Sequence, residues 1–133
     1  MGSPNYESIK YNKLIIKKLD NIKTFTAGDN TILKEVLHPK TGDGNLPFSL
    51  AHAYLPPGAS SLPHRLTKSE ETYTILQGTG KVYVDRETYE IQPGSVFVVP
   101  KNALQSVENT GADNLEFFCI VTPPWSEEEE EII

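Results

Sequence analysis

The chain consists of short segments dominated by apolar or β-branched residues, separated by turns rich in Gly, Pro, Asn and Asp. The turns recur every eight to twelve residues, which is typical of an all-β sandwich or barrel. No long window shows the apolar period of about 3.6 residues that an amphipathic helix requires. We therefore predict an all-β chain with its main strands at 31–37, 48–55, 72–76, 81–85, 87–91, 95–99, 103–108 and 114–121.

The two ends of the chain carry weaker patterns. Residues 13–19 form a short apolar segment that could be a strand. Near the other end, two prolines, Trp125 and Ser126 precede the five glutamates at 127–131. Ser126 suits the N-cap of an acidic helix, because carboxylates favour the positive end of the helix dipole. A solvated, frayed tail explains the same residues equally well, so both alternatives stay open.

Length and composition narrow the class of protein. A chain of 133 residues has room for one domain, and no apolar run approaches the roughly 18 residues of a membrane helix. There is no charged-then-apolar leader, so nothing indicates secretion. The net charge of −6 opposes a phosphate backbone, which makes nucleic acid an unfavourable partner. The single cysteine, Cys119, lies in an apolar run and is predicted to be a buried thiol in the reducing cytoplasm.

Residues with chemical potential concentrate in the stretch 58–78. A Pro-Pro-Gly turn precedes His64, and a pair of glutamates opens a β-rich segment. Alternate side chains of a strand share a face, so His64 lies on the side of Leu66, and Glu71 lies on the side of Tyr73. Two adjacent antiparallel strands with these faces turned inward would bring an imidazole and a carboxylate together. Such a pair would form half of a metal site.

The same stretch resembles the first motif of the cupin superfamily, in which Gly, His-x-His, Glu and Gly follow at fixed spacings. Gly58, His64, Glu71 and Gly78 stand at those positions, whereas Leu66 stands where the family has its second His. The resemblance is therefore specific for the fold and incomplete for the chemistry.

A second cupin motif is matched further along the chain, so the two motifs together span 58–109. Gly94, Pro100 and Asn109 fit its pattern. Gln105 replaces the last metal-binding His of that motif, and Asn102 replaces a Gly. Both motifs in the correct order indicate the cupin fold more strongly than either motif alone.

The resemblance implies a fold and an assembly. We expect a single cupin domain over 1–133, with an antiparallel double-stranded β-helix, or jelly-roll barrel, over about 31–122. The segment 13–19 would be a leading strand that packs on the barrel or crosses to a partner, and 123–133 would be an acidic tail. A homodimer through the N-terminal and edge strands is expected.

Two of the three imidazoles of a cupin metal site are missing here. The barrel could be retained for its fold alone, or another residue could supply a ligand. His52, between Ala51 and Ala53 in the strand before the first motif, is the candidate. An extra histidine on this strand resembles a cupin variant of unassigned function. The structural alternative is a core histidine that is hydrogen-bonded to the backbone.

The resemblance implies a divalent transition metal (Fe, Zn, Mn, Ni or Co) held by His52, His64, Glu71 and Gln105. Glu71 could be the fourth ligand or a base, and the amide of Gln105 could bind the metal weakly or bind a substrate. Tyr73 could exchange a proton with a bound substrate, or it could form an aromatic wall. Glu71 and Tyr73 are thus the candidate catalytic residues. A largely apolar cavity for a small organic ligand is expected to be lined by Phe48, Tyr54, Leu66 and Tyr73.

Three functions remain open from the sequence. The first is a metal-dependent enzyme acting on a small molecule, such as an oxygenase, isomerase, epimerase or lyase. The second is a metal-free, non-catalytic cupin that binds a sugar or an organic acid. The third is a barrel that serves only dimerisation. Fold alone cannot choose among these functions, because this barrel hosts many chemistries. From the candidate ligand set, we expect a metal-binding cupin with a small organic ligand.

Overall fold

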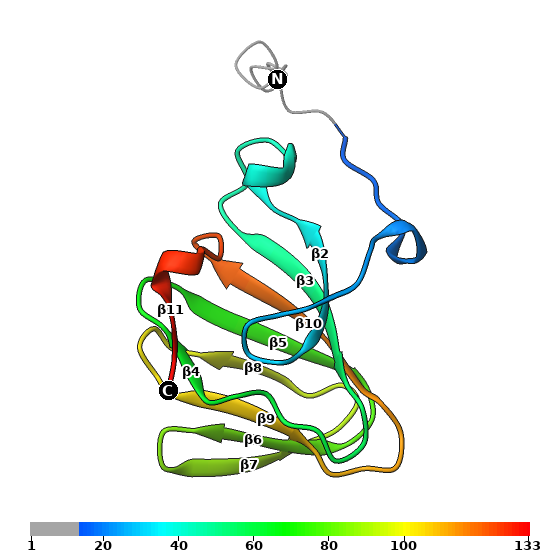
Figure 1. The fold of residues 1–133 in the computed structure, drawn as a ribbon, viewed down its shortest axis with the longest axis vertical. Helices are drawn as coiled ribbons and strands as arrows, with labels where there is room; N and C mark the ends of the chain where they lie inside the picture. Colours follow the sequence, from blue (N-terminus) through cyan, green and yellow to red (C-terminus); the bar gives the residue numbers. More distant parts are fainter. Residues whose placement is uncertain (1–13) are drawn as a thin grey trace, which may run out of the picture.

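The computed structural model describes residues 14–133, which form two antiparallel β-sheets that face each other (Figure 1). The strand order is β1-β2-β3-β10-β5-β8 in one sheet and β11-β4-β9-β6-β7 in the other. The all-β prediction is confirmed: the described residues contain no α-helix, and none of their helical turns could cross a membrane. The strands are β1 (Phe25–Thr26), β2 (Ile32–Leu37), β3 (Ser49–Leu55), β4 (His64–Leu66), β5 (Glu70–Gln77), β6 (Gly80–Val84), β7 (Glu87–Ile91), β8 (Val96–Val99), β9 (Gln105–Asn109), β10 (Leu115–Thr122) and β11 (Glu130–Ile132).

The core lies between the two sheets and follows the alternation of side chains along each strand. On β10, Leu115, Phe117 and Cys119 are buried, with exposed fractions of 0%, 2% and 5%. They pack with Tyr73 and Ile75 of β5, which are also buried. The central strand β10 pairs with β3 on one side and with β5 on the other, so segments far apart in sequence share this core.

Asn109, at the end of β9, is buried, and both the Nδ2 and the Oδ1 of its side-chain amide form hydrogen bonds within the protein. Its Nδ2 donates to the carbonyl oxygens of Leu55 and Asp113, both at 2.8 Å. Its Oδ1 accepts a hydrogen bond of 2.9 Å from the backbone N–H of Gly111. The side chain therefore joins the end of β3 to the loop before β10, which gives a structural role to the last position of the second motif.

The leading strand predicted at 13–19 is not formed in the described part of that segment. The chain there has no regular structure until the 3₁₀ turn Leu19–Asn21. Side-chain contacts, rather than a backbone ladder, attach the segment to the barrel. One of them is the hydrogen bond of 3.1 Å from Lys17 Nζ to the carbonyl of Val36. The first residue of the predicted strand lies outside the described residues.

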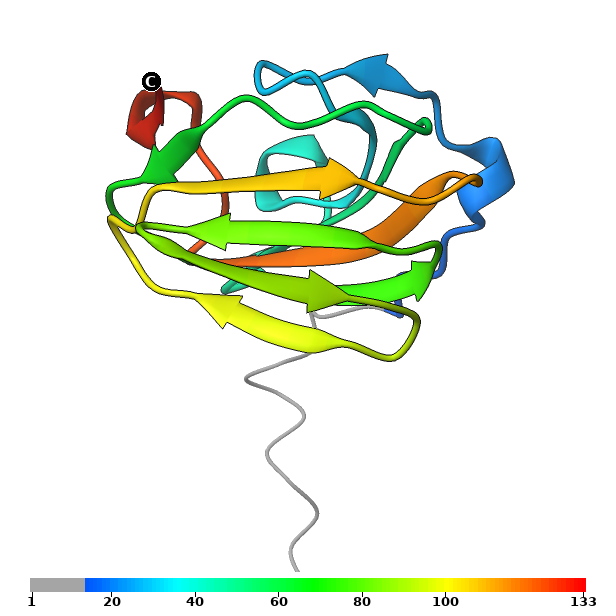
Figure 2. The same ribbon diagram turned by 90° about the horizontal axis from the view of Figure 1, so that it is seen from below.

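The acidic segment at the other end is neither an α-helix nor a solvated tail. Ser126 precedes a 3₁₀ turn, Glu127–Glu129, without making a side-chain cap, and β11 follows directly. β11 pairs with β4, so the end of the chain closes one end of the barrel (Figure 2). Glu129 is 1% exposed, and this buried carboxyl explains why the segment docks.

Candidate ligand-binding site

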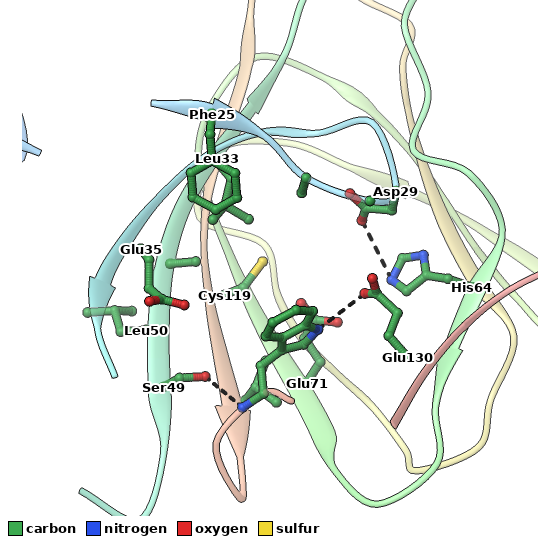
Figure 3. A pocket seen from close by; sticks show the side chains of 15 residues that line it. Phe25, Asp29, Leu33, Glu35, Ser49, Leu50, His64, Glu71, Cys119 and Glu130 are labelled. Atoms are coloured by element: carbon green, nitrogen blue, oxygen red, sulfur yellow. Dashed lines mark hydrogen bonds and ion pairs between the residues drawn. The ribbon is translucent and has the colours of Figure 1, made fainter. Parts of the chain in front are cut away.

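A cavity of about 120 Å³ lies at the end of the barrel that β1 and β11 cover (Figure 3). We refer to it as the barrel cavity. Its floor is formed by the sheet that contains β2, β3, β5 and β10, and the segments around Gly28 and Trp125 lie over it. Asp29, His64, Glu71 and Glu130 lie toward one side of the cavity, and the carboxyl of Glu35 lies across from them, near Leu50. The remaining surface is mostly apolar, with Phe25, Leu33, Ala51, Cys119 and Val121 among its residues.

His64 is the first residue of β4 and is held between two strands. Its Cα is paired with Gln105 of β9 on one side and with Ile132 of β11 on the other. The ring is buried, and its Nδ1 lies 2.8 Å from the carbonyl oxygen of Leu62. Because a carbonyl can only accept, Nδ1 carries a hydrogen, which leaves Nε2 directed toward the cavity, 3.7 Å from Oδ2 of Asp29.

Asp29 and Glu130 come from segments outside both sequence motifs. Asp29 lies in the turn after β1, where its Oδ1 accepts hydrogen bonds from the N–H and hydroxyl of Thr31 at 3.1 and 2.7 Å. Glu130 begins β11, and its Oε2 accepts a hydrogen bond of 3.3 Å from the indole N–H of Trp125. The sequence analysis places Glu130 in the acidic tail and gives Asp29 no role, because no local signal connects either residue with His64.

A chain of hydrogen bonds lies behind the carboxyl group of Glu71. The hydroxyl of Tyr73 donates to Oε1 of Gln105, and Nε2 of Gln105 donates to Oε1 of Glu71 at 3.1 Å. Gln105 and Tyr73 are 2% and 3% exposed, and neither is among the residues that line the cavity. The amide of Gln105 is therefore occupied in positioning Glu71 and Tyr73.

Burial and neighbouring charges determine the protonation of this group of side chains. Burial raises the pKa of Glu71, and the charge of Asp29 adds to the effect, while His64 and hydrogen bonds from Cys119 and Gln105 oppose it. Burial and the nearby Glu71 raise the pKa of Tyr73 and that of the Cys119 thiol well above their usual values. Tyr73 therefore stays protonated and donates to Gln105. Burial also raises the pKa of Glu130, although His64 opposes this.

The raised pKa of Glu71 predicts how stability depends on pH. The folded state holds this proton more tightly than the unfolded state, so the free energy of unfolding should fall as pH rises from the unfolded pKa through the folded pKa. Glu71→Gln should therefore match the original protein near pH 4 and be more stable at pH 7. Urea unfolding at both pH values measures this. Glu70→Gln, at the exposed neighbouring position, is the control, and an equal gain in both variants would contradict the assignment.

His52 does not lie beside His64, which corrects the expectation that the two rings share an ion. Ala51, the preceding residue of β3, lines the cavity, and alternation along the strand directs His52 to the opposite face of the sheet. There its Nε2 bonds to Oε1 of Glu116 at 3.0 Å, and its ring packs edge-on against Phe118 at 5.5 Å. A side-chain carboxylate, rather than a metal or the backbone, satisfies this imidazole.

The side chains expected to line the cavity also differ from those that do. Tyr54 follows His52 by two residues on β3 and therefore shares its outward face. Leu66 is buried, at 3% exposed, but it does not line the cavity. Tyr73 stacks on Phe97 behind Gln105, with ring centroids 4.7 Å apart. None of the four predicted residues, which also include Phe48, belongs to the cavity lining.

The metal-ligand set inferred from the resemblance is not assembled in this arrangement. Within residues 14–133, no three His, Cys, Asp or Glu side chains converge closely enough to hold one metal ion. Of the four proposed ligands, His64 and Glu71 line the cavity, Gln105 is hydrogen-bonded to protein on both sides of its amide, and His52 lies on the outer face. The residues as they stand do not fit the three-imidazole, one-carboxylate site of a cupin.

The fold and the cavity define a small protein of the double-stranded β-helix class with a site inside its barrel. Residues 51–121 match the family described as the cupin domain. The chain is 36% identical over 121 residues to the uncharacterized protein MJ1618 of Methanocaldococcus jannaschii, covering 91% of this chain and 96% of the relative. It is 32% identical over 88 residues to an oxalate-binding protein of Thermotoga maritima, covering 66% and 68%. The chain therefore belongs to the cupin family.

Solved structures show the same fold. A crystal structure described as a predicted oxalate decarboxylase from Thermotoga maritima superposes with a TM-score of 0.73 at 22% identity, covering 82% of this chain and 99% of that chain. A conserved protein with a double-stranded β-helix domain from Klebsiella pneumoniae gives a TM-score of 0.71 at 15% identity, covering 90% and 97%. These similarities confirm the expected barrel, and at these identities they concern the fold alone.

Proposed function

We propose that this protein binds a small organic molecule in the barrel cavity, with the polar group of the ligand held at the side of His64 and Glu71. The observation that carries the proposal is the composition of the cavity. Apolar walls surround a volume of about 120 Å³, and an imidazole and several carboxyl groups converge on one side of it. Small-ligand sites commonly combine apolar walls with a few convergent polar groups in this way.

The positions of the two motif residues support the proposal. His64 and Glu71 both face the cavity, and the charge of His64 acts on the carboxyl of Glu71. The relative from Thermotoga maritima is named for oxalate binding, which favours a binding role for a related barrel. Glu71 is the candidate for proton exchange with a bound molecule, because it lines the cavity, whereas Tyr73 acts on it through Gln105.

A divalent metal is the second candidate occupant, and the orientation of His64 favours it. The Leu62 carbonyl holds the hydrogen on Nδ1, which leaves Nε2 available as a ligand atom, as in many metal-bound histidines. Asp29 and Glu71 line the same cavity and are the candidate oxygen ligands. Such a mixed nitrogen and oxygen set suits ions such as Zn, Mn or Fe.

A ligand screen with two histidine variants tests the proposal. Small acids, amines and sugars are added to isotope-labelled protein, and amide resonances are recorded by NMR. We expect a bound compound to shift resonances of residues around the cavity, with the shifts lost in His64→Ala and retained in His52→Gln. Binding that perturbs only residues elsewhere, or no binding at all, would contradict a ligand site in the cavity. Elemental analysis of protein purified without a nickel column tests the metal, which should be lost in His64→Ala alone.

A homodimer and a cytoplasmic location are further parts of the proposal. Val96 and Val98 of the edge strand β8 are 63% and 54% exposed, which is unusual for apolar side chains of an edge strand and supports association through this edge. The buried, unpaired thiol of Cys119 supports a reducing compartment.

A further inference from the structure

We propose that the barrel cavity selects a small organic cation, a primary alkylammonium ion of about five heavy atoms, over an organic anion such as oxalate. This inference rests on the proposed function, because it names the class of ligand for the same cavity. It is carried by three independent properties of the cavity: the charge of its lining, the orientation of a buried imidazole, and its size.

The ionisable side chains that line the cavity are mostly acidic. Four carboxyl groups line the cavity, from Asp29, Glu35, Glu71 and Glu130, and the described lining contains neither Lys nor Arg. His64 is the single basic residue among them. An anionic ligand would place its charge against these carboxyl groups with at most one imidazolium to offset them. A cationic ligand would meet opposite charge, which is worth most in a partly desolvated site.

The carboxyl groups around the buried ring of His64 indicate a ligand that donates hydrogen bonds. The side chain is 3% exposed, and its Nε2 faces the cavity, where its nearest polar contact is the ion pair of 3.7 Å with Oδ2 of Asp29. Since the Leu62 carbonyl occupies Nδ1, Nε2 is the ring atom open to a ligand, and the carboxyl oxygens beside it are acceptors. Polar acceptors thus outnumber donors at this side of the cavity. A primary ammonium group carries three N–H donors on one atom and matches this surplus.

The remaining surface fits a short alkyl chain. Phe25 and Leu33 line the cavity away from His64, so the body of the ligand would be apolar (Figure 3). The cavity volume is about 120 Å³. A protein cavity of roughly 150 Å³ accommodates benzene, so this one suits about five heavy atoms. Butylammonium has this size, with a charged end for the carboxyl groups and an apolar end for the walls.

Calorimetry and NMR with four matched probes on the full chain test the inference. The probes are butylammonium chloride, 1-butanol, sodium butyrate and potassium oxalate, at pH 7 and low ionic strength. We expect butylammonium to bind at least 10-fold more tightly than butanol, and at least 100-fold more tightly than butyrate or oxalate. It should shift the amide of Gly28 and the indole resonance of Trp125, since both residues line the cavity.

Three variants assign the binding to the carboxyl groups. Asp29→Asn and Glu130→Gln should each weaken butylammonium binding at least 10-fold. Both keep an oxygen that can accept the hydrogen bonds from Thr31 and Trp125, and their melting temperatures verify folding. Glu131→Gln, on the neighbouring residue of β11 and 55% exposed, should leave binding unchanged.

The outcomes separate this inference from the proposed function. If butyrate, oxalate or butanol binds in the cavity as tightly as butylammonium or more tightly, the inference is wrong and the small-ligand cavity stands. If Zn²⁺ or Mn²⁺ shifts the cavity resonances and butylammonium does not, the cation selectivity belongs to a metal site and the inference is again wrong. If no small molecule or ion of any charge shifts the cavity resonances, the inference and the proposed function both fail.

Discussion

Replacing Glu129 by alanine should lower the free energy of unfolding by about 3 kcal/mol, because this carboxyl is buried and accepts hydrogen bonds through both of its oxygens. Its Oε1 accepts a hydrogen bond of 3.0 Å from the backbone N–H of Lys68, and its Oε2 accepts one of 2.8 Å from the hydroxyl of Ser69. The side chain is 1% exposed. Alanine would remove the partner of the Lys68 N–H and would create a cavity where the carboxyl lay.

Urea unfolding, followed by circular dichroism, measures this loss. Glu128→Ala is the matched control, since Glu128 is exposed in the same 3₁₀ turn and should change stability by no more than about 0.5 kcal/mol. Because Glu129 anchors the segment that leads into β11, its variant should also weaken ligand binding through Glu130. Equal stability of the two variants would show that the acidic segment does not contribute to the fold through its buried carboxyl.

The second large effect is expected at Asn109, where an almost isosteric change to aspartate should destabilise the protein by roughly 3 kcal/mol at pH 7. The Nδ2 of Asn109 donates to the carbonyl oxygens of Leu55 and Asp113. An aspartate oxygen in that place would face both carbonyls without a hydrogen, in a site that is 1% exposed. The change removes two hydrogen bonds and adds repulsion while leaving the shape of the side chain nearly unaltered.

Thermal and urea unfolding of Asn109→Asp at several pH values measure the effect. The loss should become smaller in acid, where a protonated carboxyl regains one donor. Asn114→Asp, which introduces the same charge at an exposed position just before β10, should remain within about 0.5 kcal/mol of the original protein. A loss that does not depend on pH would indicate that packing rather than hydrogen bonding explains the role of Asn109.

The strands of the barrel could be predicted because their signals are local. Turn residues bound each apolar segment, and the two motifs place Gly58, Gly78 and Gly94 at positive φ angles of 81°, 87° and 90°. The C-terminal strand β11 had no such signal, because its residues are mostly glutamates. β11 forms because the side chain of Glu129 is buried and the residues that follow it, Glu130–Ile132, pair with β4. Tertiary contacts thus override a local sequence that indicates a helix or a tail.

The position of His52 illustrates a limit of pattern analysis. Alternation along β3 shows correctly that His52 and Tyr54 share a face, but it does not show which face is inward. The structure turns the small side chain of Ala51 toward the cavity and His52 toward Lys34, its Cα partner on β2. Lys34 in turn donates to the carbonyl of Leu19, so the N-terminal segment lies over this outer face. Contacts of this kind cannot be read from the sequence of one strand.

Of the residues in the candidate site, only those that belong to the two sequence motifs could be predicted from the sequence. His64 and Glu71 stand at motif positions, so sequence analysis could select them. The expected pairing of their strands is wrong, because β4 and β5 belong to different sheets and the two side chains meet across the barrel. Asp29 and Glu130 reach the same cavity from opposite ends of the chain, through a turn after β1 and the pairing of β11 with β4. Their approach depends on long-range packing, which no local pattern encodes.

The thiol of Cys119 gives this protein a built-in chemical reporter. Cys119 is the single cysteine, it is 5% exposed, and it lines the barrel cavity beside Glu71. A small alkylating reagent must therefore enter the cavity before it can label the protein. A molecule bound in the cavity would shield the sulfur and slow the labelling. The labelling rate would therefore report whether the cavity is occupied, without engineered probes.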